Sequence, residues 1–111
     1  MITTHVLDLG RGVPAFGITV ILELRQQSGW AQVGRGVTDR TGRLATLTDN
    51  FTIVPGTYRL AFDIETYHRS QGFSTPFFPE VTITFNVHDT GQHYHVPLVL
   101  SPFGYSTYRG S

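Results

Sequence analysis

The chain has 111 residues, which is the size of one small domain and leaves no room for two. Its eight basic residues are all Arg and balance eight acidic residues, and only 14% of the chain is charged, while 13% is aromatic. This composition excludes a disordered tail and a protein that binds nucleic acid through a basic excess, and the absence of Cys excludes disulfide scaffolds, thiol catalysis and Cys-based zinc sites.

No stretch of the sequence approaches the roughly 20 apolar residues that are needed to span a bilayer. The first ten residues also lack the apolar run of a signal peptide. We therefore expect a cytoplasmic protein that does not associate with membranes.

The residue types favour β-structure. Thr, Val and Ile together account for 31 of the 111 residues, strong helix formers are scarce, and 12 Gly and 6 Pro interrupt the chain at short intervals. This pattern predicts an all-β sandwich or barrel of about eight strands. The predicted strands, in chain order, are 2–9, 18–24, 30–37, 43–48, 57–64, 79–87, 93–100 and 105–109. The only predicted helix covers 64–71, and 10–17 is expected to form a loop.

The predicted strand 93–100 separates polar from apolar side chains by alternation. One face carries four apolar side chains and is a core face: Tyr94, Val96, Leu98 and Leu100. The other face carries His93, His95, Pro97 and Val99. Because proline cannot donate to a strand ladder, Pro97 predicts an edge position or a bulge.

Two imidazoles on one strand face have three interpretations. They are an exposed pair, two ligands of a metal site completed by His5 or Asp89, or a group for acid–base catalysis near neutral pH. His5 also points away from the core on the first strand, and Arg43 directly follows a turn that ends at Gly42. The residues alone leave these alternatives open.

The last segment is unusual for a chain end, because it carries two tyrosines, an arginine and a terminal serine. Together with motifs distributed over essentially the whole chain, it resembles the transthyretin-like 5-hydroxyisourate hydrolases. These motifs are Thr4-His-Val-Leu-Asp8, Gly12-Val-Pro-Ala15, Thr38-Asp-Arg-Thr-Gly-Arg43, Phe77-Phe-Pro79, His93-Tyr-His-Val-Pro97, Leu100-Ser-Pro102 and Tyr105-Ser-Thr-Tyr-Arg-Gly-Ser111. The terminal Tyr-Arg-Gly-Ser is the most specific of them.

The resemblance implies a single domain over 1–111 with a transthyretin fold, in which two four-stranded antiparallel sheets pack together beside one short helix. It implies a homotetramer, a dimer of dimers, with active sites in the channel between the dimers. The implied reaction opens the ring of 5-hydroxyisourate, a product of urate oxidation, to give 2-oxo-4-hydroxy-4-carboxy-5-ureidoimidazoline. The implied enzyme needs no metal and no organic cofactor.

The resemblance also implies roles for particular residues. The expected catalytic residues are His5, Arg43, His95 and Ser111. The substrate-binding residues are expected to include His5, Arg43 and the terminal Tyr108, Arg109, Gly110 and Ser111, with Arg109 and Gly110 fixing the terminal strand. We do not expect His93 to be catalytic. The competing functions are a carrier of thyronines, whose family members lack these histidines and the terminal motif, and a metal-binding sandwich that uses His5, His93 and His95.

Overall fold

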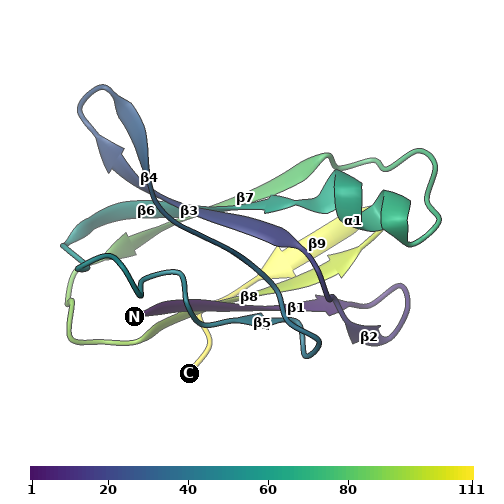
Figure 1. Cartoon of the computed structure of the whole chain (residues 1–111), viewed down its shortest axis with the longest axis horizontal. Helices are drawn as coiled ribbons and strands as arrows, with labels where there is room; N and C mark the ends of the chain where they lie inside the picture. Colours follow the sequence, from purple (N-terminus) through teal and green to yellow (C-terminus); the bar gives the residue numbers. More distant parts are fainter.

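The computed structural model describes residues 1–111 as two packed β-sheets with one short helix at an end of the sandwich (Figure 1). The first sheet has the order β2-β1-β8-β9, and β5 also pairs with β1. Its strands are β1 (Ile2–Asp8), β2 (Val13–Pro14), β5 (Arg43–Leu44), β8 (Tyr94–Ser101) and β9 (Gly104–Thr107). The second sheet has the order β4-β3-β6-β7. Its strands are β3 (Thr19–Gln26), β4 (Gly29–Val37), β6 (Gly56–Asp63) and β7 (Glu80–Val87).

The predicted all-β sandwich is confirmed, and each predicted strand is present. The segment 43–48 is extended only at its first two residues, and the loop 10–17 contains the two-residue strand β2. One pairing differs from the expected antiparallel sheets, because β1 and β8 run parallel. These strands lie near opposite ends of the chain, so no hairpin fixes their relative direction.

The core lies between the two sheets and is built by alternation along each strand. All four apolar side chains predicted for the core face of β8 are buried, from Tyr94 to Leu100. From the facing sheet, Val20 and Leu22 of β3 and Leu60 of β6 are completely buried. The opposite face of β8 is therefore free to carry polar side chains, as the sequence predicts.

The single helix α1 (Ile64–Ser70) follows β6 without a break. Asp63 caps its N-terminus by accepting a hydrogen bond from the Thr66 amide. The helix is tied to the first sheet because the Tyr67 hydroxyl donates to Asp8 Oδ2 at 2.7 Å. The helix is neither long nor apolar enough to cross a membrane.

Pro97 does not mark an edge strand, since β8 lies between β1 and β9. The β8–β9 ladder covers Leu98 to Ser101 and resumes only at a bridge between His95 and Gly110. Pro97 lies in the interruption, where it has no N–H to donate. The Thr107 hydroxyl donates to the Pro97 carbonyl at 2.7 Å and holds the two strands together there.

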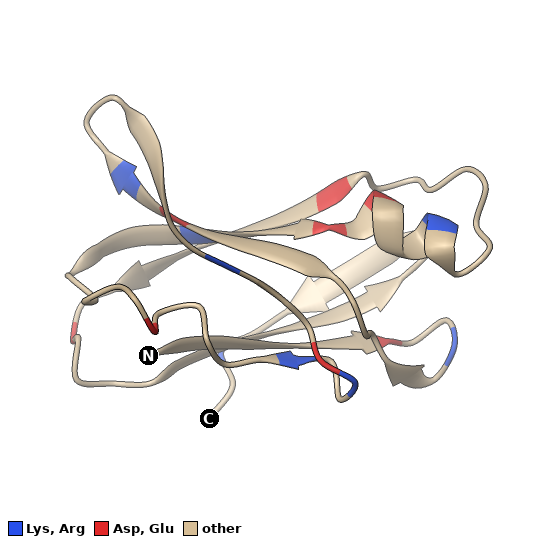
Figure 2. Ribbon diagram, viewed as in Figure 1, with Lys and Arg blue, Asp and Glu red and all other residues tan.

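The few charged residues are scattered over both sheets and the loops (Figure 2). Only two ion pairs form, Arg59 with Glu23 and Arg69 with Glu65. Hydrophobic packing and the strand ladders therefore hold the fold together, and most Arg side chains remain available for other roles.

Candidate active site

Three strands of the first sheet bring three of the predicted site residues, His5, Arg43 and His95, onto one outer face. Parallel pairing places Thr3 of β1 opposite His95 of β8. Antiparallel pairing places His5 of β1 opposite Arg43 of β5. Thr3 and His5 are two positions apart and share a face. The strand register therefore gathers two imidazoles, a hydroxyl and a guanidinium.

Arg43 is positioned by the tight turn that precedes it. The Asp39 carboxylate accepts hydrogen bonds from the Thr41 hydroxyl at 2.6 Å, the Thr41 amide at 2.8 Å and the Arg43 amide at 3.1 Å. These bonds hold the pKa of Asp39 below its usual value, with the Thr41 hydroxyl as the largest cause. Gly42 has a φ of +78°, and a Cβ there would lie 2.4 Å from the Val6 carbonyl oxygen. Only glycine lets the turn approach β1 so closely.

His5 is oriented by the same turn. Its Nε2 lies 2.8 Å from the Thr41 carbonyl oxygen. Because a carbonyl can only accept, His5 Nε2 must carry the proton in this hydrogen bond. The neutral ring therefore has its lone pair on Nδ1.

His95 is held by a buried hydroxyl. Its Nδ1 lies 2.8 Å from Thr3 Oγ1, and the same oxygen lies 2.7 Å from Nε2 of His93. Burial lowers the pKa of His95, and the positive charges of His93, His5 and Arg43 lower it further. His95 is thus neutral at physiological pH and able to accept a proton.

The C-terminal segment lies against His95. The Gly110 amide donates to the His95 carbonyl at 2.8 Å, and Ser111 follows. Ser111 lines a hollow of about 350 Å³ together with Arg43, His95 and residues of β1. Arg43, His95 and Ser111 therefore surround one space, and His93 and Thr3 line it too. His5 lies on the same face but contacts Thr41 and is outside this lining.

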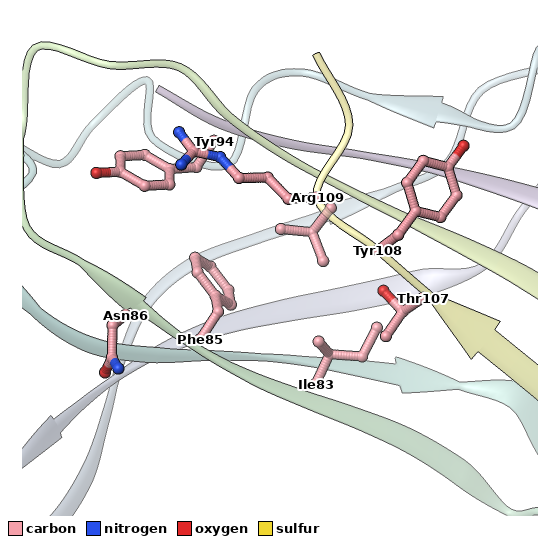
Figure 3. Close-up of a pocket in the computed structure, with 8 residues that line it drawn as sticks. Ile83, Phe85, Asn86, Tyr94, Thr107, Tyr108 and Arg109 are labelled. Atoms are coloured by element: carbon pink, nitrogen blue, oxygen red, sulfur yellow. The ribbon is translucent and has the colours of Figure 1, made fainter.

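Arg109 and Tyr108 are placed elsewhere. The Arg109 guanidinium lies 4.6 Å from the centre of the Tyr94 ring and donates to Gln92 Oε1 at 2.8 Å. Both residues border a smaller, mainly apolar cavity of about 160 Å³ (Figure 3). In that view the Arg109 side chain extends along Tyr94, while the Tyr108 ring points away from it. The guanidinium of Arg109 is therefore an anchor for the tail and is not directed at the His95 hollow.

Sequence reasoning missed Thr3 and its contact to His93. The available signal is that Thr3 precedes His5 by two positions and so shares its strand face. The three-histidine metal site has no support in the geometry, because His93 Nε2 and His95 Nδ1 both face the Thr3 hydroxyl. No group of three His, Asp or Glu side chains lies close enough to hold a metal ion.

Comparisons with known proteins agree on one family. Residues 2–110 match the model of the HIUase/Transthyretin family. The chain is 44% identical over 111 residues to the 5-hydroxyisourate hydrolase of Salmonella dublin, covering 100% of this chain and 81% of that protein. The structure of Klebsiella pneumoniae 5-hydroxyisourate hydrolase superposes with a TM-score of 0.86 at 32% identity, covering 99% and 97% of the two chains.

The sea bream transthyretin crystallised with thyroxine gives a TM-score of 0.90 at 34% identity, covering 98% of this chain and 93% of that one. The fold is thus shared by a hydrolase and by a thyroxine-bound transthyretin. The length of the match and its identity to these relatives place the chain in the HIUase/transthyretin family.

Proposed function

We propose that the protein hydrolyses 5-hydroxyisourate by opening its six-membered ring at the C6 amide carbonyl. The observation that carries this proposal is the convergence of Arg43, His95 and Ser111 on one hollow, with His95 held neutral beside a fixed cation. The product is 2-oxo-4-hydroxy-4-carboxy-5-ureidoimidazoline. The naming of the Salmonella and Klebsiella relatives as 5-hydroxyisourate hydrolases supports the same reaction.

The proposed chemistry begins with water. His95 takes a proton from a water molecule through Nε2, which has no partner within the chain, and the oxygen attacks the C6 carbonyl. Arg43 donates paired hydrogen bonds to the substrate's oxygens and stabilises the oxyanion that forms. The amide C–N bond then breaks, and the leaving nitrogen receives a proton from His95. No metal or organic cofactor enters this sequence.

The remaining residues bind and position. His5, with its proton on Nε2 engaged by Thr41, presents Nδ1 as an acceptor that orients substrate or water. Ser111 offers a hydroxyl to the substrate at the edge of the hollow. Arg109 and Gly110 hold the terminal segment in place, and Tyr108 borders the smaller apolar cavity beside this segment.

We also propose that the chain works as a homotetramer, a dimer of dimers that encloses the site in a channel. Supporting this, the site residues lie on the outer face of a sheet, and several aromatic side chains are exposed, among them Phe77, Phe103 and Tyr108. Size-exclusion chromatography with light scattering should give four times the mass of one chain. A single-chain mass would contradict the channel.

The direct test follows the ultraviolet absorbance of freshly generated 5-hydroxyisourate with and without protein. We expect decay faster than the spontaneous rate, and a loss of about 10²- to 10⁴-fold in kcat for His95→Ala. His88→Ala is the matched control, because His88 is exposed and outside the hollow. Thyroxine binding without any acceleration would instead favour a carrier. The cytoplasmic location stays a prediction that cell fractionation can test.

A further inference from the structure

Thr3, His93 and His95 form a chain of two hydrogen bonds that ends at the hollow. Thr3 Oγ1 lies 2.7 Å from His93 Nε2 and 2.8 Å from His95 Nδ1, and no other group of the chain bonds this hydroxyl. Thr3 is only 6% exposed, whereas His93 is exposed. The two bonds therefore link His95, through a buried oxygen, to an exposed imidazole at the rim of the same hollow.

A single hydroxyl couples the protonation of the two rings. Thr3 has one proton, so it can donate to only one imidazole nitrogen and must accept from the other. If His95 carries its proton on Nδ1, then Nδ1 donates to Thr3, Thr3 donates to His93 Nε2, and His95 Nε2 is a bare lone pair. If both hydrogen bonds point the other way, Thr3 donates to His95 Nδ1. The neutral His95 then carries its proton on Nε2, and Nε2 cannot act as a base.

The surroundings of the hollow select between these two directions. Arg43 lines the same hollow and has only donors and a positive charge. A His95 N–H directed into the hollow would face this cation, whereas a lone pair is attracted to it. His93, on the other side of Thr3, is exposed to water, which can bond its ring in either protonation state.

We propose that Thr3 and His93 are positioning residues that hold His95 in the tautomer with its proton on Nδ1 and pass that proton outward during turnover. When His95 Nε2 takes a proton from water, Nδ1 releases its proton to Thr3 Oγ1, and the Thr3 proton moves to His93 Nε2. One proton is thus lost by water and one is gained by His93, so the positive charge ends near solvent. His95 is left neutral, with its proton on Nε2. When Nε2 gives this proton to the leaving nitrogen, His93 Nε2 returns its proton to Thr3 Oγ1 and Thr3 returns its own to His95 Nδ1, which restores the starting state.

The tautomer can be measured without any turnover, by nitrogen-15 NMR of histidine side chains in the full-length protein near pH 8. We expect the neutral His95 of the wild type to be protonated on Nδ1. Thr3→Val keeps the branched shape but removes the hydroxyl, and we expect it to lower the Nδ1–H fraction. Thr3→Ser keeps the hydroxyl and should retain the wild-type tautomer. A wild-type His95 protonated on Nε2, or a tautomer unchanged in Thr3→Val, would overturn the proposal.

Kinetics test the outward proton transfer, which rests on the proposed hydrolase function. Thr3→Val should lower kcat about 10-fold or more with little change in KM, and Thr3→Ser should restore most of kcat. His93→Gln keeps a hydrogen-bonding group next to Thr3 but cannot take up a proton, so it should also lower kcat. Equal losses in Thr3→Ser and Thr3→Val would contradict the transfer. If the wild type fails to hydrolyse 5-hydroxyisourate, the proposed function fails, while the NMR result still decides the tautomer.

Discussion

Gly110 lies against the imidazole of His95 so closely that a Cβ at Gly110 would be 2.6 Å from His95 Cδ2. The same Cβ would be 3.3 Å from Cγ of Pro97. The Gly110 amide bonds the His95 carbonyl, so the tail cannot shift away without losing that bond. The absence of a side chain at Gly110 is therefore what lets the terminal serine reach the hollow beside an undisturbed His95.

Replacing Gly110 by Ala should damage activity far more than stability. The added methyl group either displaces the imidazole or detaches the tail, and a misplacement of about 1 Å costs on the order of 100-fold in rate. The free energy of unfolding should change little, because the segment is at the chain end. Gly104→Ala is the matched control, since a Cβ there meets only Ser101 Oγ, at 3.7 Å. Equal activity of the two variants would show that the contact to His95 is unimportant.

Arg109 should keep the C-terminal segment ordered. Arg109→Met keeps the apolar stem but removes the contact with the Tyr94 ring and the hydrogen bond to Gln92. An exposed cation–π contact contributes about 0.5–1 kcal/mol, so hydrogen exchange of the Gly110 amide should accelerate by up to about 5-fold. Arg25→Met, on the second sheet, should leave this amide unchanged. Unaltered exchange in Arg109→Met would mean that the tail is held by other contacts.

The site could be predicted in part because local patterns determine strand faces. Alternation placed His95 outside the core, and the glycine turn placed Arg43 at a strand start. Alternation cannot determine which distant strand lies alongside, so the parallel pairing that sets Thr3 opposite His95 could not be derived. The direction of the Arg109 side chain could not be predicted either, because it depends on the Tyr94 ring reaching the edge of the core. The catalytic and substrate-binding roles of the named residues remain predictions.

The charge of Arg43 should contribute to the pH range of activity, after burial and the charges of His93 and His5. His95 acts in its neutral form, so activity rises with pH through its pKa, which burial and neighbouring positive charges keep below 6.5. Arg43→Gln removes one of these charges and should raise the pKa of His95, which moves the acid limb of kcat/KM to higher pH. Arg35→Gln, exposed on the second sheet, should leave the limb in place. NMR titration compares the pKa of His95 in the wild type and in Arg43→Gln even if the variant is too slow to assay. An unchanged pKa in Arg43→Gln would contradict this account.

The turn before Arg43 should be intolerant of a side chain. Gly42 and Gly12 both have positive φ values, +78° and +69°, but a Cβ at Gly12 meets nothing within 4 Å. Gly12→Ala should therefore cost only the backbone strain, about 1–2 kcal/mol. Gly42→Ala adds a clash with the Val6 carbonyl, a backbone group in a strand, and should cost clearly more. Urea unfolding of the two variants compares these costs, and similar values would show that the turn can move away from β1.

His68 should make the fold sensitive to acid. It is 2% exposed, packs between the rings of Tyr67 and Phe73, and has no hydrogen-bond partner at either ring nitrogen. Burial lowers its pKa, and the nearby Asp8 opposes this shift more weakly. Below pH 6.5 His68 therefore takes up a proton in the unfolded chain but not in the folded chain. The free energy of unfolding then falls with falling pH, by up to about 1.4 kcal/mol per pH unit. This loss ends when the pH reaches the pKa of His68 in the folded protein.

His95 contributes in the same direction, because its pKa is also lowered. Comparison with His68→Phe isolates the buried ring: urea unfolding between pH 7.5 and 5.5 should show a smaller loss of stability in the variant than in the wild type. His88→Ala, at an exposed position, should follow the wild-type curve. Parallel curves for wild type and His68→Phe would mean that the folded protein accepts a proton at His68 as readily as the unfolded chain, for which α1 would have to open and admit water to the ring.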